Sequence, residues 1–201
     1  KDVDEAKKDV DEAKKEMVLS DIEKAGAHVS IFLGGYLVIG GKQESLDILL
    51  QNLPKEDKYP FQLPFHGAFH TPLLDSLSNQ AKGILSESIF QKPSIPLIDG
   101  QGKIWSPYST NISELYNYTL GHQVTKTYDF STAVKVAIKE YCPDKLVLLG
   151  PGNTLGGSIG QIMIQNNWLD INSKSAFSSR QKQNPYLISM GMDDQREIVS
   201  K

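Results

Sequence analysis

The sequence contains little arginine and almost no cysteine. Only Arg180 and Arg196 are arginines among its 21 basic residues, and the net charge is -3. Nucleic-acid-binding proteins typically carry a basic face, so this composition argues against a nucleic-acid partner. The single cysteine, Cys142, cannot form an internal disulfide, which is typical of a reducing compartment. We expect Cys142 to be a buried or half-buried packing thiol.

Long apolar runs are also missing. No stretch approaches the ~20 residues that a membrane-spanning helix needs, and the charged N-terminus has no signal-peptide core. The sequence therefore predicts a cytoplasmic protein without a membrane partner. Hydrophobic residues make up 39% and charged residues 22%, as in an ordinary globular domain.

The N-terminus carries a short perfect repeat. Residues Asp2–Lys8 read DVDEAKK, and Asp9–Lys15 repeat these letters. Good helix formers dominate, and acids precede lysines at helical spacing. We expect residues 1–17 to form a charged, solvated helix or linker.

Residues 18–66 alternate between helix and strand patterns, which favours a small ferredoxin-like subdomain. A first helix is expected to end at Gly26, and Gly34 and Gly35 to form a hairpin turn. The expected elements after that helix are strands at Val29–Leu33 and Tyr36–Ile39, a helix at Ser45–Leu53 and a third strand at Phe61–Phe65.

Residues 67–168 predict an α/β core, because helices alternate with short apolar strands. Ser131 or Thr132 is expected to cap one of the helices. The expected elements are a helix from Leu73 to Ile89, a strand at Ile95–Ile98, a loop at Gly100–Asn111, a helix at Ile112–Leu120, a parallel strand at Lys145–Leu149 and a helix at Leu155–Gln165. Residues 169–201 are rich in polar residues and predict a loosely ordered tail.

The segment Leu63–Leu74, LPFHGAFHTPLL, places His70 between a strand pattern and a helix pattern. Such loop positions on a rigid scaffold often carry catalytic groups. Here the sequence resembles the malonyl-CoA:acyl-carrier-protein transacylase family, in which small residues, a histidine and a helix follow a strand in this order.

Three further stretches resemble the same family. Val38–Gly41 match a strand end of its small subdomain. Gln123 precedes Thr127–Phe130 at the interval that separates an amide residue from a Pro-Val-x-Trp motif, although Pro, Val and Trp are replaced here. Leu148–Leu155 resemble its Gly-Pro-Gly-x-x-Leu signature. The resemblance covers roughly residues 18–168 and implies part of an acyltransferase α/β core.

The resemblance implies specific roles. His70 would act as the general base, with the Gln123 backbone carbonyl fixing its tautomer, and His66 would line the same cleft. The reaction would move a malonyl or related acyl group from CoA, a substrate, to the phosphopantetheine arm of an acyl carrier protein. No metal or organic cofactor is implied.

Two family features are missing from the sequence. The nucleophilic serine of Gly-His-Ser-x-Gly lies upstream of the histidine in the family, and so does the arginine that pairs with malonyl; neither is found here before His70. We therefore expect a histidine-bearing half that is inactive alone. A complementing N-terminal half would supply the serine. The alternative is a non-catalytic module of a fatty-acid or polyketide synthase that docks the carrier protein or acts as a scaffold. Docking would use Lys42, Lys103, Lys126 and Lys135 if they cluster.

Other motifs have plainer interpretations. Gly156–Gly160 match the nucleophile-elbow pattern, but Ser158 is expected inside the last helix, where small residues serve packing. The Gly150–Gly157 segment lacks the lysine of a phosphate-binding loop. His66 and His70 have the spacing of a zinc pair on a helix, yet Pro64 and Gly67 disfavour a helix there.

Overall fold

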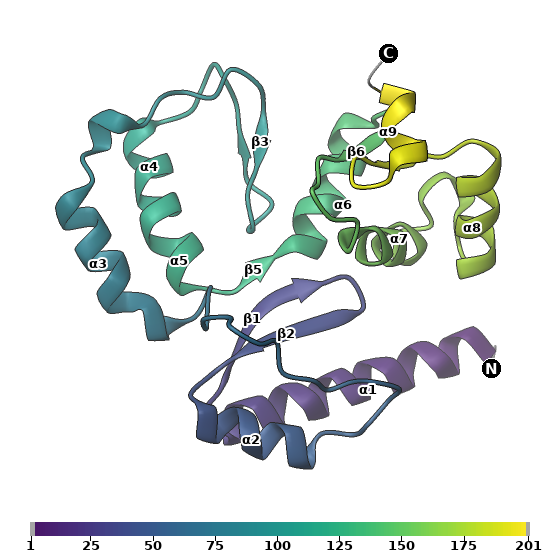
Figure 1. Ribbon diagram of the computed structural model, residues 1–201, viewed down its shortest axis with the longest axis horizontal. Coiled ribbons are helices and arrows are strands. Elements are labelled where there is room, and N and C mark those ends of the chain that lie inside the picture. The colour runs from purple at the N-terminus through teal and green to yellow at the C-terminus, as the bar shows by residue number, and fades with distance from the viewer. Residues whose placement is uncertain (1–2, 200–201) are drawn as a thin grey trace. The chain divides into compact units, whose positions relative to one another are not determined.

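The computed structural model describes the backbone of residues 3–199 and the side chains of residues 12–199. Helices and short strands are intermixed along the chain, which confirms the α/β class (Figure 1). The chain divides into two compact units. The first comprises Lys1–Ile31, Val38–Gln91 and Asn111–Tyr128, and the second comprises Phe32–Leu37, Lys92–Thr110 and Asp129–Lys201. The predicted division at residues 17, 66 and 168 stays a prediction.

Helix α1 (Val3–Lys24) runs through the repeated heptads and ends at the expected place. Gly26, two residues later, has a φ of +69°, which a glycine adopts without a Cβ penalty. Asp2 and the side chains before Glu12 lie outside the described residues. In the rest of the second heptad, Lys14 forms an ion pair with Glu56, while its neighbours are exposed.

A hairpin supplies two of the three strands of the small sheet. Strands β1 (His28–Leu33) and β2 (Tyr36–Gly40) are joined at Gly34, whose φ is +67°. Strand β5 (Tyr128–Asp129) pairs with the other edge of β1, so the order is β2-β1-β5. Next to β5, Thr127 Oγ1 donates a hydrogen bond of 2.8 Å to the Val29 carbonyl.

The expected third strand at Phe61–Phe65 is wrong, because these residues form a loop. Phe61, Leu63 and Phe65 expose 48%, 41% and 106% of their surface. Pro60 and Pro64 cannot donate to a strand ladder, and apolar residues without a facing partner gain nothing from an extended pairing. β5 occupies the free edge of β1 instead.

The remaining elements of the first unit are short helices. The long helix expected from Leu73 to Ile89 is divided, because Leu85 is extended and Ser86 starts a new turn by accepting a bond from the Ser88 amide. These elements are α2 (Gln43–Asn52), η1 (Pro72–Leu74), α3 (Asp75–Ile84), η2 (Glu87–Ile89), α4 (Ile112–Asn117), the π-helical turn η3 (Tyr118–His122) and α5 (Gln123–Thr125).

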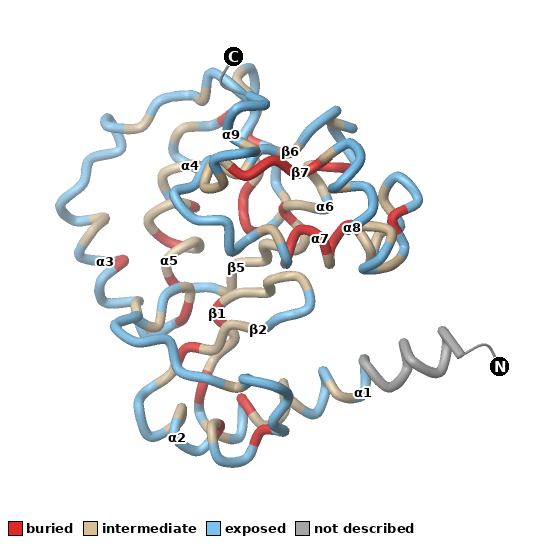
Figure 2. The backbone as a smooth tube through the Cα atoms, turned by 45° about the vertical axis from the view of Figure 1, so that its right-hand side comes forward, coloured by how far each residue is buried: buried red, intermediate tan, exposed pale blue. Residues whose placement is uncertain are grey.

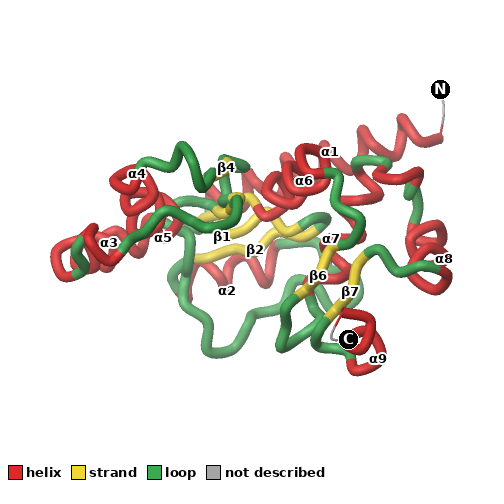
Figure 3. Tube along the Cα trace, turned by 90° about the horizontal axis from the view of Figure 1, so that it is seen from above, coloured by secondary structure: helices red, strands yellow, loops and turns green. Residues whose placement is uncertain are grey.

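The second unit is built around a parallel strand pair. Val147 of β6 is in register with Ile188 of β7, and the two strands run side by side (Figure 3). The parallel strand and the helix that follows it confirm the prediction for residues 145–165. The elements of this unit are β3 (Leu97–Ile98), β4 (Ile104–Trp105), α6 (Phe130–Tyr141), β6 (Leu146–Leu148), α7 (Leu155–Gln165), η4 (Trp168–Asp170), α8 (Lys174–Gln183), β7 (Leu187–Ser189) and α9 (Asp193–Val199).

Two local predictions in this unit are wrong. Asp129, one residue before α6, is the cap, since its Oδ1 accepts a 2.8 Å bond from the Thr132 amide. A carboxylate is a strong acceptor for the free amides of a first turn. The expected loop at 100–111 contains β4, whose Trp105 donates to the buried Asp99 carboxylate at 2.9 Å.

The polar composition of residues 169–201 gave a wrong expectation of loose order. Strand β7 is buried along its whole length (Figure 2). Ile171, Tyr186 and Leu187 join Ile159 and Met163 of α7 in one apolar cluster. Burial raises the pKa of Tyr186, whose hydroxyl donates to the Pro143 carbonyl at 2.9 Å. A few apolar residues with partners are therefore enough to order a polar segment.

Candidate functional site

His70 lies at the turn between an exposed loop and the helical segment η1–α3, and it belongs to the first unit. Its φ is +57°, in the left-handed region, where residues other than glycine are uncommon. Such a conformation costs of order 1–3 kcal/mol and persists where the surroundings hold it. The geometry of this histidine therefore depends on its neighbours.

Two buried hydroxyl groups hold the backbone beside His70. Ser30 Oγ, from β1, donates to the Phe69 carbonyl at 2.7 Å, and Thr71 Oγ1 donates to the Ala68 carbonyl at 2.6 Å. Ser30 is 4% exposed and Thr71 is fully buried. A Cβ added at Gly40 would lie 2.9 Å from the Thr71 methyl group, so only glycine at this position lets the turn pack on β2.

The imidazole of His70 has a defined hydrogen bond. Its Nδ1 lies 2.5 Å from the Gln123 backbone carbonyl oxygen. A carbonyl oxygen can only accept, so Nδ1 carries a proton and Nε2 keeps its lone pair in the neutral ring. The Tyr128 ring, with its centroid 5.4 Å from that of His70, packs beside the imidazole.

The Gln123 carbonyl is available because it lies at the end of a helical run. The run comprises α4, the π-helical turn and α5, and Lys126 is extended with a φ of -126° and a ψ of 152°. Carbonyls in the last turn of a helix lack a partner within that helix. His70 supplies the partner for this one.

His66 lies on the same loop, four residues before His70. Its ring is exposed, and its Nδ1 forms a 3.0 Å hydrogen bond with the Pro64 carbonyl. These residues are not helical, so the four-residue spacing of His66 and His70 does not place them on one face as a zinc-binding pair on a helix would be. Among the described residues, no group of three or more His, Cys, Asp or Glu side chains could hold a metal ion.

In the second unit, Ser158 lies inside α7 and is 3% exposed, as expected from its distance from the preceding strand. A Cβ at Gly34 would lie 2.7 Å from the Ser158 carbonyl, so the small residues here allow close packing of the hairpin turn on the helix. This is not the strand-to-helix turn of a nucleophile elbow.

The remaining candidate residues are Cys142 and the four lysines of the predicted docking surface. Cys142 is exposed, and the expectation of a packing thiol is wrong, because this residue leaves α6 in a left-handed conformation with a φ of 43°. Lys42 and Lys126 belong to the first unit, whereas Lys103 and Lys135 belong to the second.

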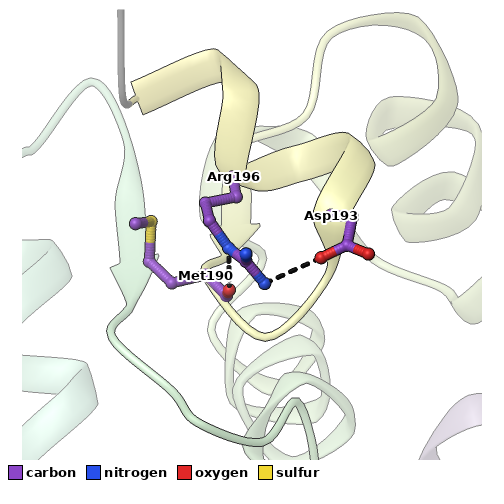
Figure 4. Close-up of polar contacts among 3 residues, drawn as sticks. All are labelled: Met190, Asp193 and Arg196. Carbon is purple, nitrogen blue, oxygen red and sulfur yellow. Dashed lines mark hydrogen bonds and ion pairs between the residues drawn. The ribbon is translucent and has the colours of Figure 1, made fainter.

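Arg196 is engaged within its own segment. The guanidinium donates to the Met190 carbonyl at 2.9 Å and to Asp193 Oδ1 at 2.8 Å (Figure 4). Met190 lies in the loop after β7, and Asp193 is the first residue of α9, so this arginine is paired with groups that are close to it in the sequence.

Sequence reasoning missed the residues that hold the site. Ser30 and Thr71 carry no motif, although each places a hydroxyl beside an apolar stretch, which is a weak signal for a buried donor. The π-helical turn at Tyr118–His122 was not predicted either, because the helix expected from the sequence ends within it, at Leu120.

The chain thus combines a histidine loop, a glycine-rich strand-turn-helix and small sheets in an α/β fold. The solved malonyl CoA-acyl carrier protein transacylase from Clostridium perfringens has this fold: the TM-score is 0.60 at 18% identity, covering 91% of this chain and 52% of that chain. This similarity confirms the fold expected from the sequence.

A sequence comparison points the same way. The chain is 24% identical over 135 residues to the polyketide biosynthesis acyltransferase homolog PksD of Bacillus subtilis, covering 67% of this chain and 40% of the relative. No family model matches. The two similarities support the resemblance to acyltransferases, and the chain spans about half the length of the proteins that it matches. In the part that the structure describes, every helix is too short or too polar to cross a membrane.

Proposed function

We propose that this chain is the histidine-bearing half of an acyltransferase. In this proposal a malonyl or related acyl group moves from CoA to the phosphopantetheine thiol of an acyl carrier protein. The observation that carries the proposal is the His70–Gln123 pair, in which a backbone carbonyl holds the Nδ1 proton and leaves Nε2 as the base. A complementing segment supplies the nucleophilic serine.

The first half-reaction loads the enzyme. Nε2 of His70 takes the proton of the serine hydroxyl while the serine oxygen attacks the thioester carbonyl. The carbon–sulfur bond then breaks, and the imidazolium returns the proton to the departing CoA sulfur. The product is an acyl-serine ester, and His70 is again neutral.

The second half-reaction is the reverse on a new thiol. Nε2 removes the proton of the phosphopantetheine thiol, and the thiolate attacks the acyl-serine carbonyl. The carbon–oxygen bond breaks, and the proton passes from the imidazolium to the serine oxygen. Throughout both steps, Nδ1 keeps its proton on the Gln123 carbonyl, which supplies the orienting role of a triad without a carboxylate.

The acyl group and the carrier protein would approach from the exposed side of the loop. His66 is proposed to contact the acyl thioester, because its ring is exposed and lies on the same loop as His70. Carrier proteins are generally acidic, so we propose that Lys42 and Lys126, exposed residues of the same unit, contribute to docking.

The test is reconstitution. The chain is mixed with an acyltransferase segment that bears the Gly-His-Ser-x-Gly motif, together with malonyl-CoA and carrier protein, and malonyl adducts are followed by intact-mass spectrometry. We expect transfer only from the mixture. His70→Ala should reduce the rate by about 10²–10⁴-fold, the contribution of a general base.

The control is His28→Gln, a histidine at the start of β1, which should transfer at the unsubstituted rate. Equal rates for His70→Ala and the unsubstituted chain would contradict the role of His70. Carrier-protein binding without transfer in any mixture would instead indicate a docking module. An adduct formed by the chain alone would show that it has its own nucleophile.

A further inference from the structure

A π-helical turn lies directly before Gln123. The helical run that starts at α4 widens at Tyr118–His122, and the Gln123 amide donates to the Tyr118 carbonyl, five residues earlier. A π-helical turn contains one more residue than an α-helical turn, and such turns are rare and concentrate at functional sites.

The extra residue determines which carbonyl faces His70. In an α-helix, successive residues are rotated by about 100° around the axis, as 3.6 residues per turn requires. Closing the π turn into α geometry would rotate the backbone after it by a comparable angle. The Gln123 carbonyl would then no longer be directed at Nδ1 of His70.

Contacts from α3 hold this turn. Ser78 is 5% exposed, and its hydroxyl donates to the Leu120 carbonyl at 2.5 Å. A Cβ at Gly121 would lie 2.7 Å from Lys82 Nζ, so the glycine leaves room for the end of this α3 side chain beside the turn. Within the run, Thr125 Oγ1 donates to the Gly121 carbonyl at 3.2 Å.

We infer that Ser78 is a positioning residue for His70. Its hydrogen bond to Leu120 stabilises the π-helical turn, which presents the Gln123 carbonyl to Nδ1 and thereby selects the tautomer with a basic Nε2. Within the part of the chain that the structure describes, Ser78 donates to the Leu120 carbonyl and not to His70 or Gln123, so it acts through the backbone between them. The functional consequence rests on the proposed role of His70, but the effect on the tautomer does not.

The test compares Ser78→Ala with Ser76→Ala in the whole chain. Ser76 is an exposed serine on the same helix and serves as the matched control. The tautomer of His70 is read from the nitrogen-15 shifts of its ring, assigned with a His70→Gln variant. The Nδ1–H form should dominate in the unsubstituted chain and in Ser76→Ala.

In Ser78→Ala, the ratio of the Nδ1–H to the Nε2–H form should fall by about twofold to tenfold, the range that one hydrogen bond of ordinary strength corresponds to. Ser78→Thr, which restores a hydroxyl, should recover the original ratio. If Ser78→Ala does not fold, Ser78→Cys, with similar volume and a weaker donor, should show a shift of the same sign. An unchanged ratio in a folded Ser78 variant overturns the inference.

The reconstituted transfer assay separates this inference from the proposed function. A shifted tautomer in Ser78→Ala, with no transfer by any form of the chain, supports the positioning role and contradicts the acyltransferase role. Transfer that requires His70, together with an unshifted tautomer in Ser78→Ala, supports the acyltransferase role and overturns the positioning role.

Discussion

The turn at residues 68–71, which carries His70 and is called the histidine turn below, and the β6–β7 strand pair are stabilised in different ways. Beside His70, the backbone is held by single hydrogen bonds from the buried hydroxyls of Ser30 and Thr71. Around β7, order comes from an apolar cluster that includes Met163 and Leu187. Each part belongs to a different unit of the chain.

This difference predicts how each part responds to mutation. A hydrogen bond contributes about 0.5–1.5 kcal/mol, whereas removing a large buried side chain costs about 2–5 kcal/mol. Substitutions at the strand pair should therefore lower stability strongly, and substitutions at the histidine turn should change geometry at a small cost in stability. Substitutions at the histidine turn can therefore change the position of His70 without unfolding the unit that carries it.

The largest effect on stability is expected for Ile188→Ala. This side chain is fully buried in β7, so its truncation should lower the free energy of unfolding by about 2–5 kcal/mol. Val147, its partner in register on β6, is 40% exposed, and Val147→Ala should cost less than about 1 kcal/mol. Urea unfolding followed by tryptophan fluorescence measures both, because Trp105 and Trp168 belong to this unit. Equal losses would show that β7 is not the centre of the core.

The sequence predicted the elements whose pattern is local. The apolar run at Lys145–Leu149, followed by glycines, gave the strand, the turn and α7 at their observed places. The hairpin around Gly34 was predictable for the same reason, because its turn requires a residue that accepts a positive φ. In both cases a few adjacent residues determine the structure.

The errors arise where the partner lies far away in the sequence. Phe61–Phe65 have the composition of a strand, but β5 occupies the edge of β1. Residues 187–189 lie in a polar segment, but β6 gives them a parallel partner. The composition of a segment says nothing about its partner, so it cannot predict which of two segments will pair with the free edge of a strand.

The residues of the candidate site show the same contrast between what the sequence alone predicts and what depends on distant partners. His70 and Gln123 were predicted from a family resemblance that fixes their order along the chain. Ser30, Thr71 and Ser78 could not be predicted, because their roles depend on which carbonyl the fold places within reach of each hydroxyl. Tertiary structure, not sequence spacing, selects these donors.

Ser30→Ala should have a smaller effect than Ile188→Ala. The substitution leaves the Phe69 carbonyl without its donor, which should lower the opening free energy of the β1 amides by about 1 kcal/mol. Amide hydrogen exchange of β1 measures this change. The control is Ser76→Ala, which should leave exchange in β1 unchanged. A loss of 3 kcal/mol or more (far above the ~1 kcal/mol of one hydrogen bond) would mean that the turn is part of a larger cooperative core.

The smallest effect is expected for Gln123→Ala, although Gln123 is one of the two residues of the proposed catalytic pair. His70 contacts its backbone carbonyl, which alanine retains, and alanine is a better helix former than glutamine. The His70 tautomer and the reconstituted transfer rate should therefore stay within about twofold of the unsubstituted chain, well below the effect of removing a general base. Nitrogen-15 shifts and the intact-mass assay measure the two quantities. A rate as low as that of His70→Ala, with an unchanged tautomer, would mean that the glutamine side chain itself acts on the substrate. If both the tautomer and the rate changed, the side chain would instead be needed to hold the π-helical turn, and positioning of His70 would not be a property of the backbone alone.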